Sequence, residues 1–175
     1  TRSNFLGCHV QARLSLYAYG GGIAGILTSS TIDDSYAHVN INGEEHVGGL
    51  AGRLYRTNVA NSYSEGIVKA SIREAGGIAG YIELSKVYTS YAIVEVPKVT
   101  FGGGLLGNGH SFNSKDCYYL DGNSRGIAGS PIAYFDMQNL AHFPGWFTGN
   151  FWRSRPGFSP LLPGIPRTFN SISIN

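Results

Sequence analysis

The side chains that could carry out chemistry are eleven carboxylates, five histidines and two cysteines. Cleavage of a glycosidic bond needs a proton donor and a second carboxylate about 5–10 Å apart, and a metal site needs ligands at short, regular spacings. The carboxylates occur instead as isolated residues or as pairs typical of turns: Asp33-Asp34, Glu44-Glu45, Glu65, Glu83 and Glu95. The histidines are equally dispersed: His9, His38, His46, His110 and His142. We therefore expect solvated surface charge, with no catalytic residues, no metal and no cofactor.

Residues 20–25 and 102–107 both satisfy G-x-G-x-x-G, the fingerprint of dinucleotide-binding sites. That site requires a strand before the glycines and a helix after them. Here polar turn residues and a further strand-like segment follow each copy, so we expect no nucleotide. Only 14% of the residues are charged and the net charge is +2, which also argues against a nucleic-acid partner.

The glycine motif belongs to an internal repeat, and glycine supplies 25 of the 175 residues. Gly22-Ile23-Ala24-Gly25 recurs at residues 49–52, 77–80 and 104–107, at offsets of 27, 28 and 27. A second motif, Asp34-Ser35-Tyr36-Ala37, recurs at residues 61–64, 89–92 and 116–119 with the same offsets. Two motifs that keep one period indicate a repeat architecture. A partial copy at residues 7–10 predicts that the array continues before the residue at which this chain begins.

Apolar and polar residues alternate after each tyrosine, with Ala37, Val39 and Ile41 on one side of the predicted strand. A unit of 27–28 residues with three short strands and no helix is typical of one coil of a β-solenoid. A β-sandwich built from repeated hairpins is the alternative. We predict an all-β, right-handed parallel β-solenoid of about four to five coils over residues 1–125. Glycine at each corner would supply positive φ or allow the next coil to approach closely.

This register predicts the state of the cysteines. Cys8 and Cys117 share the column of Ser35, Ser62 and Ser90 but lie four coils apart. At about 4.8 Å per coil they are separated by roughly 19 Å, whereas a disulfide needs Cα atoms within about 7 Å. We expect two free thiols.

The same register aligns one aromatic residue per coil on the outer side of the strands: His9, Tyr36, Tyr63, Tyr91 and Tyr118. We name this column the tyrosine ladder. Stacked rings with hydroxyl tips suit a sugar or a protein surface, so the ladder is the candidate ligand-binding site. The alternative is that the rings only stiffen the sheet or lie under a neighbouring segment.

The period fails after Gly126, and residues 126–175 are predicted to form a C-terminal capping segment. Ser130-Pro131 can begin a short helix that continues to about Leu140, and Phe169 to Ile174 could form an edge strand. A dense apolar group suits a cover over the exposed core of a solenoid: Met137, Leu140, Phe143, Trp146, Phe147, Phe151 and Trp152. No apolar run approaches the ~18 residues of a membrane span, so no membrane insertion is expected.

The glycine-aliphatic-glycine motif followed by Ser-Tyr-Ala resembles the GLUG-motif repeat of bacterial surface proteins, including filamentous-haemagglutinin-like adhesins and the non-catalytic part of some immunoglobulin A proteases. Residues 118–121, 135–137, 143–147 and 158–161 resemble the segment that closes such arrays. The resemblance implies an extracellular or cell-surface location and a non-catalytic adhesive or receptor-binding module at the C-terminal tip of a larger fibre or adhesin. Its expected partner is a cell-surface glycan or protein, and a homotrimer is compatible with such a fibre. A structural spacer and a polysaccharide-degrading β-helix enzyme are the alternatives.

Overall fold

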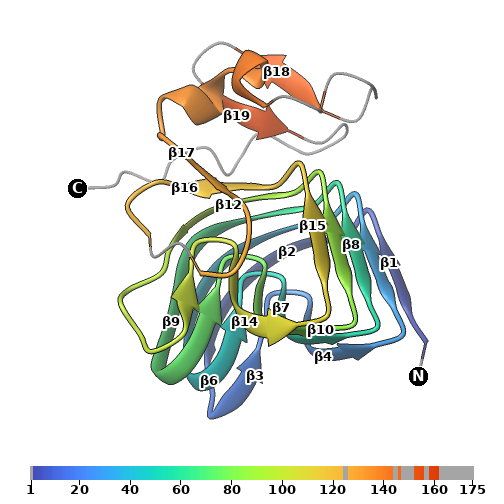
Figure 1. Ribbon diagram of the computed structural model, residues 1–175, viewed down its shortest axis with the longest axis vertical. Coiled ribbons are helices and arrows are strands. Elements are labelled where there is room, and N and C mark those ends of the chain that lie inside the picture. The colour runs from blue at the N-terminus through green and yellow to red at the C-terminus, as the bar shows by residue number, and fades with distance from the viewer. Residues whose placement is uncertain (1, 124–125, 144–145, 147–151, 156–157, 162–175) are drawn as a thin grey trace.

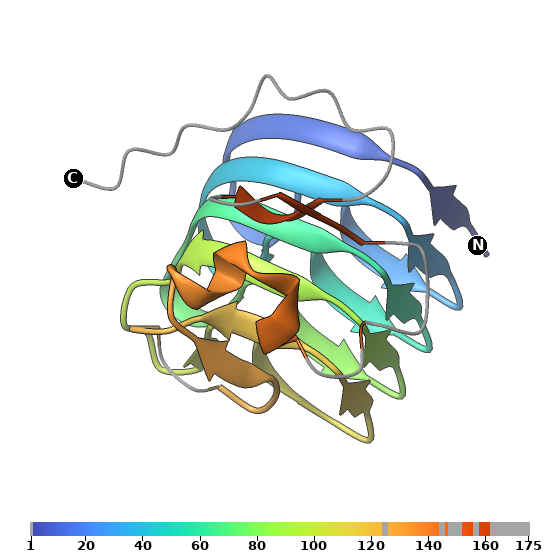
Figure 2. The same ribbon diagram turned by 90° about the horizontal axis from the view of Figure 1, so that it is seen from above.

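A computed structural model describes residues 2–123, 126–143, 146, 152–155 and 158–161. Within these residues three parallel sheets form the sides of a solenoid whose coils stack one on the next (Figure 1, Figure 2). The first sheet has five short strands: β1 (Asn4–Leu6), β5 (Thr31–Asp33), β8 (Asn58–Ala60), β11 (Lys86–Tyr88) and β15 (Asn113–Lys115). The second sheet has four: β4 (Ala24–Thr28), β7 (Ala51–Tyr55), β10 (Ala79–Glu83) and β14 (Leu106–His110).

The third sheet holds the longest strands. Its main path is β2 (His9–Ser15), β6 (Tyr36–Gly48), β9 (Tyr63–Gly76), β12 (Tyr91–Glu95), β16 (Tyr118–Leu120) and β17 (Ser130–Ile132). Two further strands pair with the far ends of β6 and β9: β3 (Ala18–Gly20) and β13 (Gly102–Gly103). The Cα register joins Tyr36 to Tyr63 and Tyr63 to Tyr91. One repeat therefore makes one coil, which confirms the predicted β-solenoid, with about four turns.

The predicted strand faces are confirmed. Ala37, Val39 and Ile41 are buried in one continuous apolar core that also holds the aliphatic residues of the glycine motifs, such as Leu50 and Ile78. Because each coil places the same position one strand spacing from its copy, apolar side chains form columns through the interior.

Hydroxyl side chains at two corners tie adjacent coils together. The Ser35 hydroxyl donates to the Asp33 carbonyl (2.7 Å) and accepts from the Cys8 backbone N–H (3.0 Å). Ser62 repeats this pattern one coil further on. A second column of the same kind contains Ser30, Thr57 and Ser85. These bonds satisfy backbone groups that the corners would otherwise leave buried without partners.

Both cysteines are free thiols, as predicted. Cys117 takes the place of the corner serine, and its thiol donates to the Lys115 carbonyl (3.2 Å).

The glycine corners of the first four motifs require space rather than unusual dihedral angles, whereas Gly126 and Gly129 of the fifth motif adopt positive φ (60° and 86°). A Cβ at Gly49 would meet the Gly77 carbonyl oxygen of the next coil, and one at Gly77 would meet the Gly104 carbonyl oxygen. Positive φ is adopted instead by non-glycine residues such as Asp34 (47°) and Asn61 (45°). Of the two predicted reasons for glycine at this corner, close approach of the next coil applies in the first four motifs, and positive φ applies in the fifth.

The capping segment differs from the prediction. Ser130–Ile132 is strand β17, paired in parallel with β16, and the helical segments described after it are short 3-10 turns, including η1 (Asp136–Gln138) and η2 (Leu140–His142). The cause is the fifth glycine motif, which still stacks on the fourth through a hydrogen bond from Ile127 N–H to the Leu106 carbonyl (3.5 Å). The shortened coil therefore returns the chain to the sheet as a strand.

The rest of the described cap is an antiparallel pair, β18 (Arg153–Arg155) and β19 (Phe158–Leu161). The predicted strand at 169–174 lies outside the described residues. Across the described part of the chain, no helix has the length and apolar character needed to cross a membrane.

Candidate functional site

The tyrosine ladder exists, and its rings stack as the repeat predicts. The ring centroids of Tyr36 and Tyr63 are 5.0 Å apart and those of Tyr63 and Tyr91 are 4.8 Å apart, with interplanar angles of 9° and 5°. His9 lies 4.7 Å from Tyr36 with a tilted ring. The ladder runs along the outward face of β2, β6, β9, β12 and β16.

The tyrosines of the ladder are nevertheless buried. Their exposed fractions are 4% for Tyr36, 2% for Tyr63, 0% for Tyr91 and 9% for Tyr118. Burial raises the pKa of all four hydroxyls, most strongly those of Tyr63 and Tyr91. The expectation that these four rings present an outer surface to a ligand is therefore wrong, and only His9 of the five ladder residues is exposed.

The cover is the C-terminal cap, which lies over this face of the third sheet (Figure 1). Trp152 and Trp146 lie with their ring centroids 5.3 and 5.8 Å from that of Tyr91. The Tyr91 hydroxyl donates to the Pro160 carbonyl (2.6 Å), and the Trp146 indole N–H donates to the Asp116 carbonyl (2.8 Å). The tyrosine ladder is thus the surface against which the cap packs.

A second group of side chains gathers at the corner between the third and second sheets, where β3, β6 and β9 end. Tyr19, His46 and Glu74 occupy one position in successive coils, each with positive φ (59°, 52° and 64°). The second glycine of each motif makes room for them, because a Cβ at Gly52 would meet the His46 carbonyl oxygen and one at Gly80 would meet the backbone of Val47 and His46. The glycine repeat therefore positions this corner.

The three side chains contact one another across the coils. The Tyr19 and His46 rings stack with centroids 4.7 Å apart and an interplanar angle of 9°. His46 Nδ1 lies 2.5 Å from Glu74 Oε2. The Asn108 amide donates to the other oxygen, Glu74 Oε1 (3.2 Å). Glu74 is 4% exposed and is the buried carboxylate of this corner.

A more exposed ion pair borders the same imidazole. Arg73 donates from Nε (3.0 Å) and from an Nη (2.8 Å) to Glu45 Oε2, which lies 3.8 Å from His46 Nε2. Burial is the largest influence on the His46 ring and lowers its pKa, against the opposing effects of Glu74 and Glu45. We name these six residues the corner cluster: Tyr19, Glu45, His46, Arg73, Glu74 and Asn108.

The corner cluster continues onto the outer face of the second sheet. The Arg53 guanidinium lies 5.4 Å from the centre of the Tyr81 ring and donates to Glu83 (3.1 Å). Tyr81 meets the His46 ring edge-on at 5.6 Å, and the His110 ring at 6.4 Å. We name Arg53, Tyr81, Glu83 and His110 the outer strip. Its side chains are partly or fully exposed on β7, β10 and β14.

The prediction that acids and histidines stay dispersed is therefore wrong at this corner. His46 and Glu74 lie 28 residues apart, which is one repeat, so the period that aligned the tyrosines also predicts their contact. The signal was hidden because successive coils place different residue types, tyrosine, histidine and glutamate, at this position.

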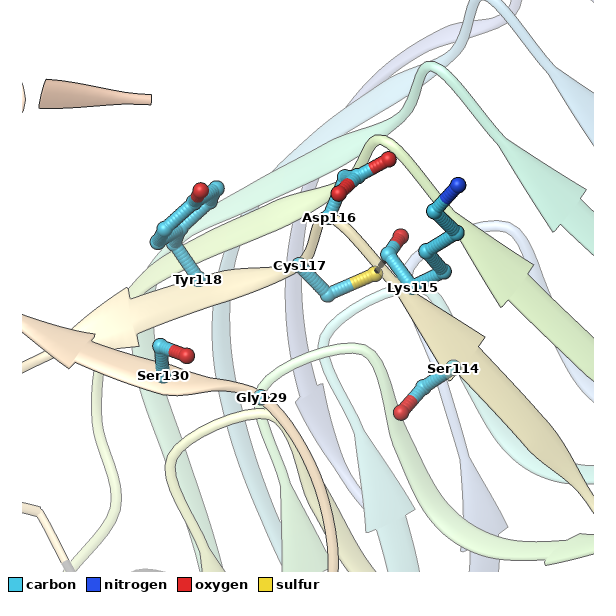
Figure 3. A pocket seen from close by; sticks show the side chains of 7 residues that line it. All are labelled: Ser114, Lys115, Asp116, Cys117, Tyr118, Gly129 and Ser130. Carbon is cyan, nitrogen blue, oxygen red and sulfur yellow. Dashed lines mark hydrogen bonds between the residues drawn. The ribbon is translucent and has the colours of Figure 1, made fainter. Parts of the chain in front are cut away.

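A groove of about 420 Å³ lies at the C-terminal end of the solenoid, between β15, β16 and β17 (Figure 3). Its lining includes Ser114, Lys115, Asp116, Cys117 and Ser130. Burial raises the pKa of the Cys117 thiol to about 12. The thiolate needed for nucleophilic chemistry is therefore essentially absent at neutral pH.

Comparison with known proteins identifies one repeat and the fold. A family model described as "The GLUG motif" matches residues 43–69, which form one coil. No curated protein matches the chain. A crystal structure from Bacteroides ovatus, described as a "putative immunoglobulin A1 protease", is similar with a TM-score of 0.62 and 20% identity over 91% of this chain. The chain spans 57% of that protein's length. At this level of identity the likeness concerns the fold alone.

Proposed function

We propose that this chain is a non-catalytic binding module of an extracellular or surface-attached protein, and that it recognises a cell-surface glycan or protein through the outer strip. The observation that carries the proposal is the grouping of Arg53, Tyr81, Glu83 and His110 on adjacent strands of the second sheet, beside the corner cluster. Aromatic residues and arginine are enriched where proteins bind partners. A tyrosine face also packs against the apolar face of a sugar ring.

The coil that matches the GLUG motif supports the surface location, because such repeats resemble those of bacterial adhesins. Two contacts support the non-catalytic assignment. The Arg53 guanidinium is paired with the Glu83 carboxylate and the Arg73 guanidinium with the Glu45 carboxylate, so both acids already contact a cation of this chain.

The test is binding of the purified chain to a glycan array and to intact host or bacterial cells, followed by affinity measurement on any hit. Truncating Tyr81 to alanine should weaken binding by at least tenfold, as for a central aromatic contact. Tyr88→Ala, on β11 of the first sheet, is the matched control and should bind like the wild type.

Equal affinity for the Tyr81→Ala and Tyr88→Ala variants would place recognition elsewhere. An array and cell panel with no binding above background would favour the spacer role. Release of product from immunoglobulin A1 or from common polysaccharides would overturn the non-catalytic assignment.

A further inference from the structure

The corner cluster brings together three groups that are typical metal ligands. Glu45, His46 and Glu74 each offer one ligand atom, and these atoms all lie within 4.8 Å of one another. We propose that this centre binds one divalent transition-metal ion of the zinc class, through an imidazole nitrogen of His46 and carboxylate oxygens of Glu45 and Glu74. The inference goes beyond the proposed function, because it depends on these three residues alone and holds whether or not the outer strip binds a receptor.

The charge of the centre favours a cation. Two carboxylates face the imidazole, whereas one cation serves both: Arg73 is paired with Glu45, and its Nε lies 4.0 Å from Glu74 Oε2. The side chain of Glu74 is only 6% exposed. Its Oε2 has no hydrogen bond of acceptable geometry, although His46 Nδ1 lies 2.5 Å away. A buried carboxylate oxygen with no aligned donor is costly, and a bound cation would remove that cost.

The donor set selects the class of ion. One imidazole nitrogen with two carboxylate oxygens is a ligand set used by Zn²⁺, which tolerates a fourth, open position. Ca²⁺ and Mg²⁺ prefer oxygen ligands only.

The surroundings leave one oxygen of each carboxylate available. Arg73 donates to Oε2 of Glu45, so Oε1 can ligate. Asn108 donates to Oε1 of Glu74, and Oε2 faces His46. Stacking on Tyr19 fixes the plane of the imidazole. Such outer partners orient metal ligands and raise affinity.

Only small movements are needed to bind the ion. Zinc ligands lie about 2.0–2.2 Å from the metal, so tetrahedral neighbours are about 3.4 Å apart. One ligand atom from each of Glu45, His46 and Glu74 lies within 4.8 Å of the other two, and His46 Nδ1 and Glu74 Oε2 are 2.5 Å apart. Rotation of the partly exposed Glu45 side chain, together with small shifts of His46 and Glu74, would cover these differences.

The test is isothermal titration of the metal-stripped chain with ZnCl₂, with equilibrium dialysis and elemental analysis to count bound ions. We expect one Zn²⁺ per chain, with millimolar Ca²⁺ and Mg²⁺ failing to displace it. His46→Ala and Glu45→Ala should each weaken binding at least tenfold. Glu45 is partly exposed, so its variant keeps the fold even if changes at Glu74 do not.

The matched control is His38→Ala. His38 also faces a glutamate one coil away, with His38 Nδ1 4.0 Å from Glu65, and its removal should leave zinc affinity unchanged. Circular dichroism establishes that each variant is folded. A wild-type chain that binds less than one Zn²⁺ would overturn the proposal. The proposal would also be overturned if folded Glu45→Ala and His46→Ala bound zinc with unchanged affinity. Loss of zinc binding in His38→Ala would overturn it as well.

Discussion

Removing the Tyr91 side chain should release the cap while leaving the coils folded. Tyr91 is fully buried, lies 4.8 Å from the Tyr63 ring and packs against Trp146 and Trp152. Truncating a buried aromatic residue costs about 3–5 kcal/mol. The lost hydrogen bond to the Pro160 carbonyl adds about 1–3 kcal/mol if that carbonyl stays buried. Tyr91→Ala should therefore lower the unfolding free energy by roughly 4–8 kcal/mol at most, and by less if the cap detaches.

Tryptophan fluorescence reports this event directly. The chain has two tryptophans, Trp146 and Trp152, both buried in the cap. Tyr91→Ala should shift their emission to longer wavelength while far-ultraviolet circular dichroism keeps the β-sheet signal. Tyr91→Phe, which keeps the ring, should leave the emission near that of the wild type and cost only about 1–3 kcal/mol.

The control is Tyr88→Ala, a half-exposed tyrosine on the first sheet, which should change stability by less than about 1 kcal/mol. If Tyr91→Ala left both the tryptophan emission and the unfolding free energy within error of the wild type, the packing of the cap on the ladder would be refuted.

Three further outcomes are expected. Above the ordinary tyrosine pKa of about 10, the free energy of unfolding should fall with rising pH, because tyrosines of the unfolded chain ionise while burial raises the pKa of Tyr63 and Tyr91 in the folded chain. Urea unfolding combined with absorbance at 295 nm measures this effect. A free energy of unfolding that is constant or rises from pH 9.5 to 11 would contradict it. Burial raises the pKa of the Cys117 thiol to about 12, so Cys117 should resist a thiol reagent at pH 8 in the folded chain, whereas the more exposed Cys8 should react. Equal reaction rates of the two thiols would contradict the burial of Cys117. Gly49→Ala should lower the thermal midpoint by several degrees, because its Cβ meets the next coil; an unchanged midpoint would show that the coils are not in close contact there.

The repeat was sufficient to predict the architecture. Motifs 27 and 28 residues apart predicted that Tyr36, Tyr63 and Tyr91 lie in one column and which face of each strand points inward. The same period placed Cys8 and Cys117 too far apart for a disulfide, and both are free thiols. These features depend on contacts between identical positions of adjacent coils, which a period in the sequence encodes directly.

Features outside the period could not be predicted in this way. The ladder is covered by Trp146 and Trp152, which lie after the repeats end, so no spacing relates them to the tyrosines. Ser130-Pro131 has the composition of a helix start, but pairing with β16 prevails over that local preference. The contact between His46 and Glu74 obeys the period but joins residues of different types, both at positive φ. A repeat recognised from identical residue types therefore does not reveal this contact.

The central claim is that residues one repeat apart meet at the corner that carries the candidate site, and disulfide trapping tests it most directly. In a chain with Cys8 and Cys117 changed to serine, Glu45→Cys combined with Arg73→Cys creates a pair in Cα register. Mild oxidation should cross-link this pair, as mass spectrometry of the digested protein would show, because neighbouring strands place Cα atoms within the ~7 Å that a disulfide needs. Glu45→Cys combined with Lys69→Cys, whose register partner is Asn42, should not cross-link. Efficient cross-linking of the shifted pair with none of the registered pair would contradict the account.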